Sequence, residues 1–204
     1  MIMKKVKLSK EQTILSSLGF FNQFIDELEG RHVNVFQLSK DTLKKMILNF
    51  YYLTWKENFD ASSKANTYKL FKEKPSLEIY LEHLKDFRYI KTLTKFRLSD
   101  HKLMIEEGRR RRPKVEKAER LCIYCDKMAV EDEIHFLLDC DKYTAERNLF
   151  LQKIGNFYPN FLRIAESKAK FIFFMSQENT DVTKIIANFI HKTLIVRDSS
   201  RINC

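Results

Sequence analysis

The chain is organised around the segment Cys122-Ile-Tyr-Cys-Asp-Lys-Met-Ala-Val-Glu-Asp-Glu-Ile-His-Phe-Leu-Leu-Asp-Cys140. It holds three of the four cysteines and one of the five histidines, in the spacing C-x2-C-x9-H-x4-C. Two cysteines separated by two residues can bring both sulfurs to one ion from a tight turn, and a His and a Cys complete the tetrahedron that structural zinc prefers. The spacing predicts one structural zinc ion bound by Cys122, Cys125, His135 and Cys140. The alternative is a group of ordinary buried cysteines beside a surface histidine.

The composition indicates a folded, mainly helical protein. The 204 residues are 44% hydrophobic and include 17 Phe, which is too apolar for a disordered chain and sufficient for one good core or two small ones. Only four Gly and three Pro occur, which favours long helices over many short strands. We expect a mainly α fold, a helical bundle with a small zinc-stapled CCHC lobe.

The excess of basic residues points to a polyanionic partner. Lys and Arg number 37 against 27 Asp and Glu, a net charge of +10 that suits RNA, DNA or an acidic membrane face. A basic protein with a solvated surface and no such partner would have the same composition. No signal-peptide pattern, glycosylation sequon or apolar run of transmembrane length occurs in the sequence. We therefore expect an intracellular protein, in which clustered Cys and His are more often metal ligands than disulfides.

Apolar periodicity and capping residues predict the helices. The expected elements are a helix at 10–29 opened by Ser9 and Gln12, a strand-like segment at 33–38, a helix capped by Ser39, a polar linker at 59–67, a helix from Pro75 to Arg97 with Leu77 facing inward, a short helix at 101–107 ended by Gly108, and an unpacked loop at 109–120. The expected regions are 1–60, 61–120, the zinc lobe 121–155 and 156–204, or alternatively one compact unit.

Around the expected metal site the helix must break. His135 and Cys140 are five residues apart, and five steps of about 100° would leave them about 140° apart on a regular helix. We expect a short helix from Glu131 to Leu138, a break near Cys140 and a new helix at 142–154. Two further helices are expected at 167–176 and 180–196.

A basic block precedes the cysteines. Between residues 85 and 120, thirteen Lys or Arg face six Asp or Glu, so most of the net charge lies here. Guanidinium groups in a loop can track phosphates. The candidate contacts are Lys91, Lys95, Arg97, Arg109, Arg110, Arg111, Arg112, Lys114, Lys117 and Arg120. The alternatives are a nuclear-import signal and a solvated loop. Tyr89 and Phe96 could stack on bases, but their spacing favours core positions.

No pattern indicates an enzyme. With Gly only at positions 19, 30, 108 and 155, no glycine-rich phosphate loop can be written, and neither H-E-x-x-H, G-x-S-x-G nor an adjacent Asp pair occurs. A zinc ion with four protein ligands has no open position for a reacting water. We expect a non-catalytic protein.

Three stretches carry a family resemblance: Thr94-Lys-Phe-Arg-Leu-Ser-Asp-His-Lys-Leu-Met-Ile-Glu-Glu-Gly-Arg109, Leu121-Cys-Ile-Tyr-Cys125 and Val130-Glu-Asp-Glu-Ile-His-Phe-Leu-Leu-Asp-Cys140. With Tyr143 and Arg147, they resemble the C-terminal zinc-binding region of non-LTR retrotransposon reverse transcriptases. In that family the region follows the polymerase and helps it to hold template RNA and target DNA. The resemblance implies the same four metal ligands. The polymerase palm and the endonuclease are absent, and Asp141 stands where the family often has Pro.

The expected function is therefore non-catalytic binding of RNA or DNA backbones by a retrotransposon-derived module, in the nucleus or the cytoplasm and not at a membrane. The alternative is a protein-interaction scaffold. In that hypothesis the Phe-rich helices at 10–29 and 171–196 dock a reverse transcriptase or another protein, and zinc is purely structural. The arginine-rich loop, Arg109 to Lys114, then forms a nuclear-import signal.

Overall fold

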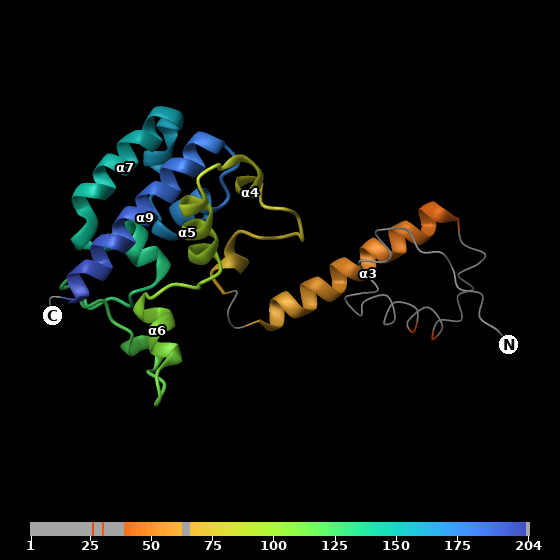
Figure 1. Cartoon of the computed structure of the whole chain (residues 1–204), viewed down its shortest axis with the longest axis horizontal. Helices are drawn as coiled ribbons and strands as arrows, with labels where there is room; N and C mark the ends of the chain where they lie inside the picture. The colour runs from red at the N-terminus through yellow and green to blue at the C-terminus, as the bar shows by residue number, and fades with distance from the viewer. Residues whose placement is uncertain (1–25, 27–29, 31–38, 63–65, 203–204) are drawn as a thin grey trace. The chain divides into compact units, whose positions relative to one another are not determined.

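The computed structural model describes residues 26, 30, 39–62 and 66–202. It divides the chain into an N-terminal unit, Met1–Ala61, and a C-terminal unit, Ser62–Cys204. Figure 1 draws the remaining residues in grey. The helix predicted at 10–29 and the strand predicted at 33–38 lie outside the described residues, apart from the helical positions Asp26 and Gly30.

In the N-terminal unit the structure describes one long helix, α3 (Lys40–Ala61). The predicted cap is confirmed, because Ser39 Oγ accepts a hydrogen bond from the Thr42 amide at 3.2 Å. On α3, Trp55 stacks on Phe59 with 4.7 Å between ring centroids. The predicted linker was placed too early, since α3 continues past Phe59 to Ala61.

The described part of the C-terminal unit is mainly helical, which confirms the mainly α prediction. Its elements are η3 (Tyr68–Leu70), α4 (Ile79–His83), α5 (Phe87–Arg97), α6 (Met104–Arg110), η4 (Lys117–Glu119), η5 (His135–Asp139), η6 (Asp141–Tyr143), α7 (Thr144–Phe157), η7 (Pro159–Arg163), α8 (Ser167–Met175) and α9 (Thr180–Ile202). Instead of a strand, the described residues contain one isolated antiparallel bridge, between Leu121 and Val130. None of the described helices has the length and apolarity needed to cross a membrane.

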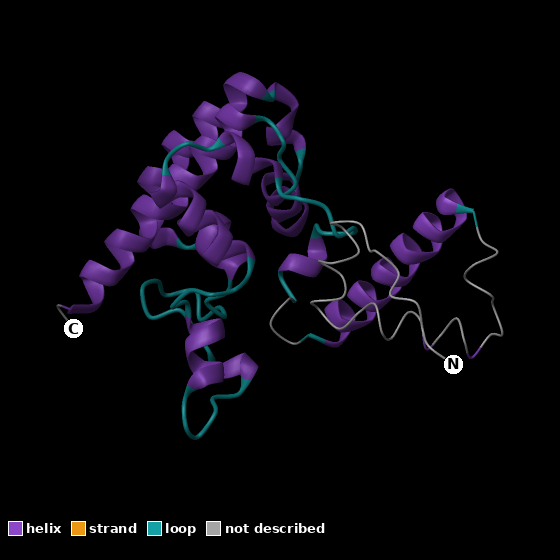
Figure 2. Ribbon diagram, turned by 45° about the vertical axis from the view of Figure 1, so that its right-hand side comes forward, coloured by secondary structure: helices purple, strands orange, loops and turns teal. Residues whose placement is uncertain are grey.

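The core of the C-terminal unit lies where α5 and α7 pack against the long helix α9, as Figures 1 and 2 show. Phe150 of α7 stacks on Phe189 of α9 with 4.5 Å between ring centroids. Phe171 and Phe174 of α8 are buried in the same cluster. The Phe residues at 171–196 therefore serve the core, and the partner-docking role that the scaffold hypothesis assigned to them is wrong for these buried side chains.

The helix predicted from Pro75 to Arg97 is two helices. Leu84 ends α4 in an extended conformation, and Asp86 opens α5 as a new N-cap, with its carboxylate accepting from the Arg88 amide at 2.9 Å. The apolar spacing continues across this break, so periodicity alone did not reveal it. Leu77 was expected to face inward but is 63% exposed.

The segment 109–120, predicted as a loop, is partly helical. Helix α6 continues through Gly108 to Arg110, and Gly108 is a buried helical residue, not the helix end. After α6 the chain turns at Arg111 to Glu116 and returns through η4. We call residues 104–119 the arginine spur, because they project from the helices of the core in Figures 1 and 2.

Candidate metal centre and basic surface

The four predicted metal ligands lie together. One ligand atom from each of Cys122, Cys125, His135 and Cys140 falls within 4.8 Å of all the others. The Cys122 and Cys140 sulfurs are 3.8 Å apart, and Cys125 Sγ is 3.4 Å from His135 Nε2. A tetrahedral zinc ion with Zn–S bonds of about 2.3 Å and Zn–N bonds of about 2.0 Å would have S–S edges of about 3.8 Å and S–N edges of about 3.5 Å. The cluster therefore has the donor set and the dimensions to hold one metal ion.

A tight hairpin presents the first two thiols. The Glu131 amide donates to the Arg120 carbonyl at 2.9 Å, and the Cys122 amide donates to the Ala129 carbonyl at 2.8 Å. Met128 adopts the left-handed conformation at φ 48°, which lets the chain reverse within a few residues. We call residues 120–131 the cysteine hairpin. The hairpin brings the sulfurs of Cys122 and Cys125 into one cluster, as the Cys-x-x-Cys spacing predicted.

A π turn presents the other two ligands. Residues His135–Asp139 form a π-helical turn, and the Cys140 amide donates to the His135 carbonyl at 2.7 Å. A hydrogen bond that spans five residues brings positions i and i+5 to one side, which a regular α-helix cannot do. The sequence predicted a helix and a break here; the structure corrects the helix type. Asp132 helps to start the turn by accepting from the His135 amide at 2.8 Å.

A buried arginine supports the last ligand. Arg147 Nε donates to the Leu137 carbonyl at 3.0 Å, and Arg147 Nη2 donates to the Cys140 carbonyl at 2.5 Å. Burial lowers the pKa of Arg147, and the neighbouring Cys140 opposes this shift. Nothing in the sequence indicated that the Arg147 guanidinium would bind these two carbonyls.

The sulfurs of Cys122 and Cys140 share a hydrogen bond. The bond to Cys140, together with burial, raises the pKa of Cys122 to about 12, and the same bond lowers the pKa of Cys140. Binding a metal ion requires both groups as thiolates, so the ion must displace the proton that Cys122 retains.

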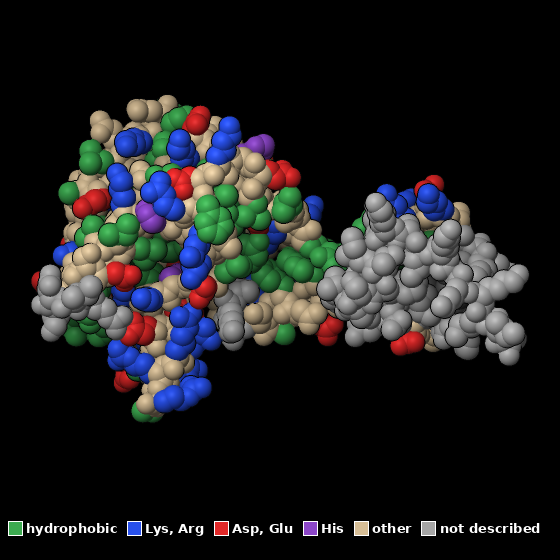
Figure 3. All heavy atoms as spheres, in the orientation of Figure 1, with side chains coloured by type: hydrophobic (Ala, Val, Ile, Leu, Met, Phe, Trp, Pro, Cys, Tyr) green, Lys and Arg blue, Asp and Glu red, His purple; other side chains and the backbone are tan. Residues whose placement is uncertain are grey.

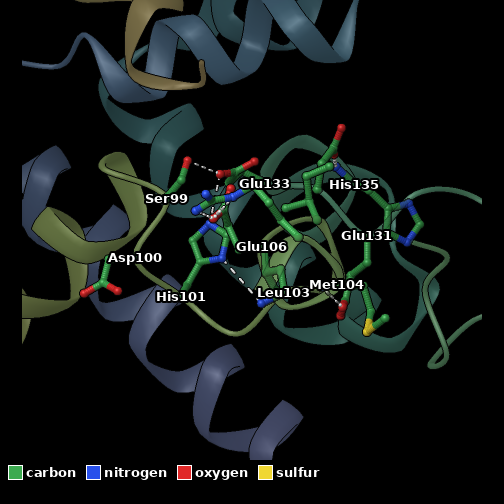
Figure 4. A network of polar contacts seen from close by, with 12 residues as sticks. Ser99, Asp100, His101, Leu103, Met104, Glu106, Glu131, Glu133 and His135 are labelled. Atoms are coloured by element: carbon green, nitrogen blue, oxygen red, sulfur yellow. Dashed lines mark hydrogen bonds and ion pairs between the residues drawn. The ribbon is translucent and has the colours of Figure 1, made fainter. Parts of the chain in front are cut away.

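Buried carboxylates beside the metal ligands bond this lobe to other segments of the C-terminal unit, and Figure 4 shows the contacts of Glu133. Glu133 accepts from Ser99 Oγ at 2.7 Å and contacts His101 Nε2 at 2.9 Å. Burial alone would raise the pKa of Glu133, but the hydrogen bonds from His101 and Ser99 outweigh it and lower the pKa. Glu131 forms a two-bond ion pair with Arg197 of α9, with both distances 2.7 Å. The sequence did not reveal these contacts.

Most of the predicted phosphate contacts lie on the surface. Lys91, Lys95, Arg110, Arg111, Arg112, Lys114 and Lys117 are exposed, and Arg109 is partly exposed. Blue side chains cover much of the projecting spur in the space-filling view of Figure 3. Arg109 bonds Glu106, Arg110 lies 3.5 Å from Asp100, and Arg111 lies 3.5 Å from Glu107.

Two predicted contacts are not on the surface. Arg97 donates to the Met175 carbonyl at 2.6 Å and to Glu78 at 2.7 Å, and its guanidinium lies 4.6 Å from the centre of the Phe71 ring. Arg120 donates to backbone carbonyls within the spur. Both side chains are buried, so their prediction as phosphate contacts was wrong: each guanidinium is used inside the fold.

The two aromatic residues interleaved with these cations belong to the core. Phe96 is completely buried, so it cannot stack on a base. Tyr89 packs against the core, and its hydroxyl donates to Asn188 Oδ1 at 3.2 Å. The preference for core positions is therefore confirmed.

No protein-family model matches the chain, and no curated protein or solved structure matches it. The resemblance of residues 94–147 to the retrotransposon proteins therefore stays a prediction. The functional interpretation depends on the geometry of the metal centre and the spur.

Proposed function

We propose that this protein is a non-catalytic nucleic-acid-binding module that holds RNA or DNA by its backbone. The observation that supports the proposal is the arginine spur, which carries Arg109 to Arg112, Lys114 and Lys117 on one short projection. Cations concentrated in this way provide an electrostatic footprint for a chain of phosphates. Backbone contacts carry no sequence information, so we expect little sequence preference.

Most cations of the spur are available to phosphate oxygens, whereas Arg109 is bonded to the buried Glu106. Arg110 and Arg111 form ion pairs in which the arginine side chain is about half exposed. Surface ion pairs of this kind contribute only about 0–1 kcal/mol to stability. Phosphate oxygens can replace those carboxylates. Within the described part of the chain, Arg112, Lys114 and Lys117 form no ion pair at all. The spur can therefore bind a polyanion without dismantling a buried network.

In this proposal the metal is zinc and its role is structural. Cys122, Cys125, His135 and Cys140 supply four protein ligands, which leaves no open position for chemistry. Structural zinc sites of this kind contribute an apparent binding free energy of about 10–16 kcal/mol that is available only to the folded chain. The ion would fasten the cysteine hairpin to the π turn.

The proposal includes descent from the C-terminal region of a non-LTR retrotransposon reverse transcriptase. That resemblance supports nucleic-acid binding, since holding template RNA and target DNA is the role of the region in the family. It offers no catalytic residue. Its weight lies in residues 94–147, which contain the spur and all four candidate ligands.

The test is the affinity of the zinc-loaded chain for structured RNA and duplex DNA over a series of salt concentrations. The logarithm of the affinity should fall linearly with the logarithm of the salt concentration, by about 0.9 for each neutralised phosphate on duplex DNA. Replacing Arg109 to Arg112 by Ala should reduce the slope by several contacts. The matched control replaces four exposed cations elsewhere, Lys142, Lys153, Arg163 and Lys168, and should leave the slope nearly unchanged.

The alternative function is a protein-interaction scaffold in which the spur is a nuclear-import signal. A specific observation favours keeping it: Leu149, Phe157, Leu162 and Ile195 are exposed apolar side chains of the C-terminal unit. Absence of nucleic-acid binding even at low salt would favour the scaffold. Nuclear accumulation that depends on Arg109 to Arg112 would then be its expected behaviour in cells.

A further inference from the structure

The shape of the arginine spur depends on a side chain that it does not expose. Arg120 follows the spur and reaches back across its base, where Nε and Nη2 donate to the Val115 carbonyl at 3.0 and 2.9 Å. Its Nη1 donates to the Ile105 carbonyl at 2.7 Å. One guanidinium thus binds both the first turn of α6 and the returning segment of the spur.

Gly108 provides the space for this arrangement. A Cβ atom at Gly108 would lie 2.7 Å from Arg120 Cγ and 2.9 Å from Arg120 Cδ, which is closer than two carbon atoms without a bond between them approach. The Arg120 side chain cannot simply swing away, because its far end is bound by three hydrogen bonds to carbonyls. The Gly108 carbonyl also accepts from the Val115 amide at 3.0 Å, directly beside this contact.

The cysteine hairpin holds the same base. The Arg120 carbonyl accepts from the Glu131 amide at 2.9 Å, two residues before the candidate ligand Cys122. At the other root of the spur, the Glu131 carboxylate accepts from the Met104 amide at 2.7 Å, and the Glu131 carbonyl accepts from the Ile105 amide at 3.1 Å. The spur is therefore joined to the hairpin that carries two of the candidate metal ligands at both roots: by the chain itself at Arg120, and by the bonds of Glu131 to Met104 and Ile105.

We propose that Arg120 is a positioning residue that holds the arginine spur in one conformation and links that conformation to the occupancy of the metal centre. A metal ion orders the cysteine hairpin, the hairpin fixes the backbone of Arg120 and Glu131, and the Arg120 guanidinium fixes the spur. The link between Arg120 and the metal centre does not require nucleic-acid binding; only the benefit of an ordered spur rests on the proposed function. A spur that is ordered before binding loses less conformational entropy when it meets phosphates.

The link must act in both directions, because coupled equilibria are reciprocal. If the metal ion orders the spur through Arg120, then loosening Arg120 must weaken the binding of the metal ion. This consequence can be measured in a folded, metal-loaded protein. It needs neither nucleic acid nor a stable metal-free state.

The experiment compares two changes at the contact with two matched controls. Gly108→Ala places a methyl group against Arg120, and Arg120→Lys keeps the charge but loses the two-carbonyl fork. The controls are Gly155→Ala, where an added Cβ meets nothing within 4 Å, and Arg163→Lys on an exposed side chain. Two quantities are measured in each zinc-loaded protein: hydrogen exchange of the Arg111 and Val115 amides, and zinc affinity by competition with a chelator.

We expect Gly108→Ala and Arg120→Lys to speed exchange at Arg111 and Val115 by about tenfold or more, as expected when hydrogen bonds that order a segment are lost. Zinc affinity should fall by about threefold or more in the same two proteins, and neither quantity should change in the controls. Unchanged exchange in both variants would overturn the positioning role. Faster exchange with unchanged zinc affinity would overturn the link to the metal centre. Failure of the unmodified chain to bind RNA or DNA would count against the proposed function alone.

Discussion

The amide of Cys140 donates to the carbonyl of His135 at 2.7 Å. This hydrogen bond spans five residues and brings the two candidate ligands to the same side of the chain. On an α-helix the two side chains would point in different directions. The π turn adds the extra residue that returns Cys140 to the side of His135. Arg147 then binds the carbonyls of Leu137 and Cys140, so the turn is held from α7 as well.

Cys125→Ser should abolish stoichiometric metal binding. A serine hydroxyl is not ionised at neutral pH and is a poor zinc ligand, so three donors would remain in a site built for four. Native mass spectrometry should detect one zinc ion per unmodified chain and none in the variant. Cys204→Ser is the matched control, because it leaves all four candidate ligands in place. One retained zinc ion in Cys125→Ser would contradict the assigned ligand set.

Removal of the metal ion should destabilise the C-terminal unit. The cysteine hairpin contains one isolated bridge and few other backbone bonds, so an ion bound by Cys122 and Cys125 would supply much of its order. Loss of several kcal/mol should lower the melting temperature by on the order of 10 °C or more. Calorimetry before and after chelation provides the measurement, and restoration of the melting temperature by added zinc is the control. The same melting curve in both states would rule out a structural role for the ion.

Metal affinity should rise with pH. Cys122 has a pKa raised to about 12 by its bond to Cys140 and by burial, so in the metal-free fold it is protonated at neutral pH. The ion binds the thiolate, so binding releases this proton and becomes more favourable as the proton concentration falls. Apparent affinity should increase about tenfold per pH unit for each proton released. Titration calorimetry in buffers of different ionisation enthalpy should detect the release. A pH-independent affinity would show that no thiol proton is displaced.

Arg197→Ala should be strongly destabilising. Both members of the Arg197–Glu131 pair are 1% exposed, so the substitution leaves a buried carboxylate without its cation. Such a loss costs about 3–5 kcal/mol, measured as the free energy of unfolding in urea. Arg88→Ala is the control, since the pair of Arg88 with Asp86 is exposed, so this substitution should change the free energy of unfolding far less. Equal effects of the two substitutions would contradict the role of burial.

Phe96→Ala should cost about 3–5 kcal/mol in the free energy of unfolding, because it removes a completely buried ring and leaves a cavity. The Phe96 ring packs against Phe136 of the π turn and Phe171 of α8. Phe87→Ala offers the comparison within the same helix. Its ring is 71% exposed, so the change should stay within about 0.5 kcal/mol. A small effect of Phe96→Ala in urea unfolding would place that residue outside the folded core.

The sequence by itself determined the features that depend on neighbours along the chain. The Ser39 cap, the extent of α8 and most of α9 follow from local capping and apolar spacing. The grouping of Cys122, Cys125, His135 and Cys140 follows because a metal ion restricts which residue types and spacings can surround it.

Only the tertiary structure decided which cations are exposed and which are buried. Arg97 and Arg110 look alike in the sequence, but Arg97 reaches the carbonyl of Met175, 78 residues away, and is buried. Arg120 likewise finds its acceptors inside the spur, although it belongs to the same basic block as the exposed Arg112. The physical reason is that a guanidinium can be buried wherever the fold supplies enough acceptors, and those acceptors come from segments that local pattern does not bring together.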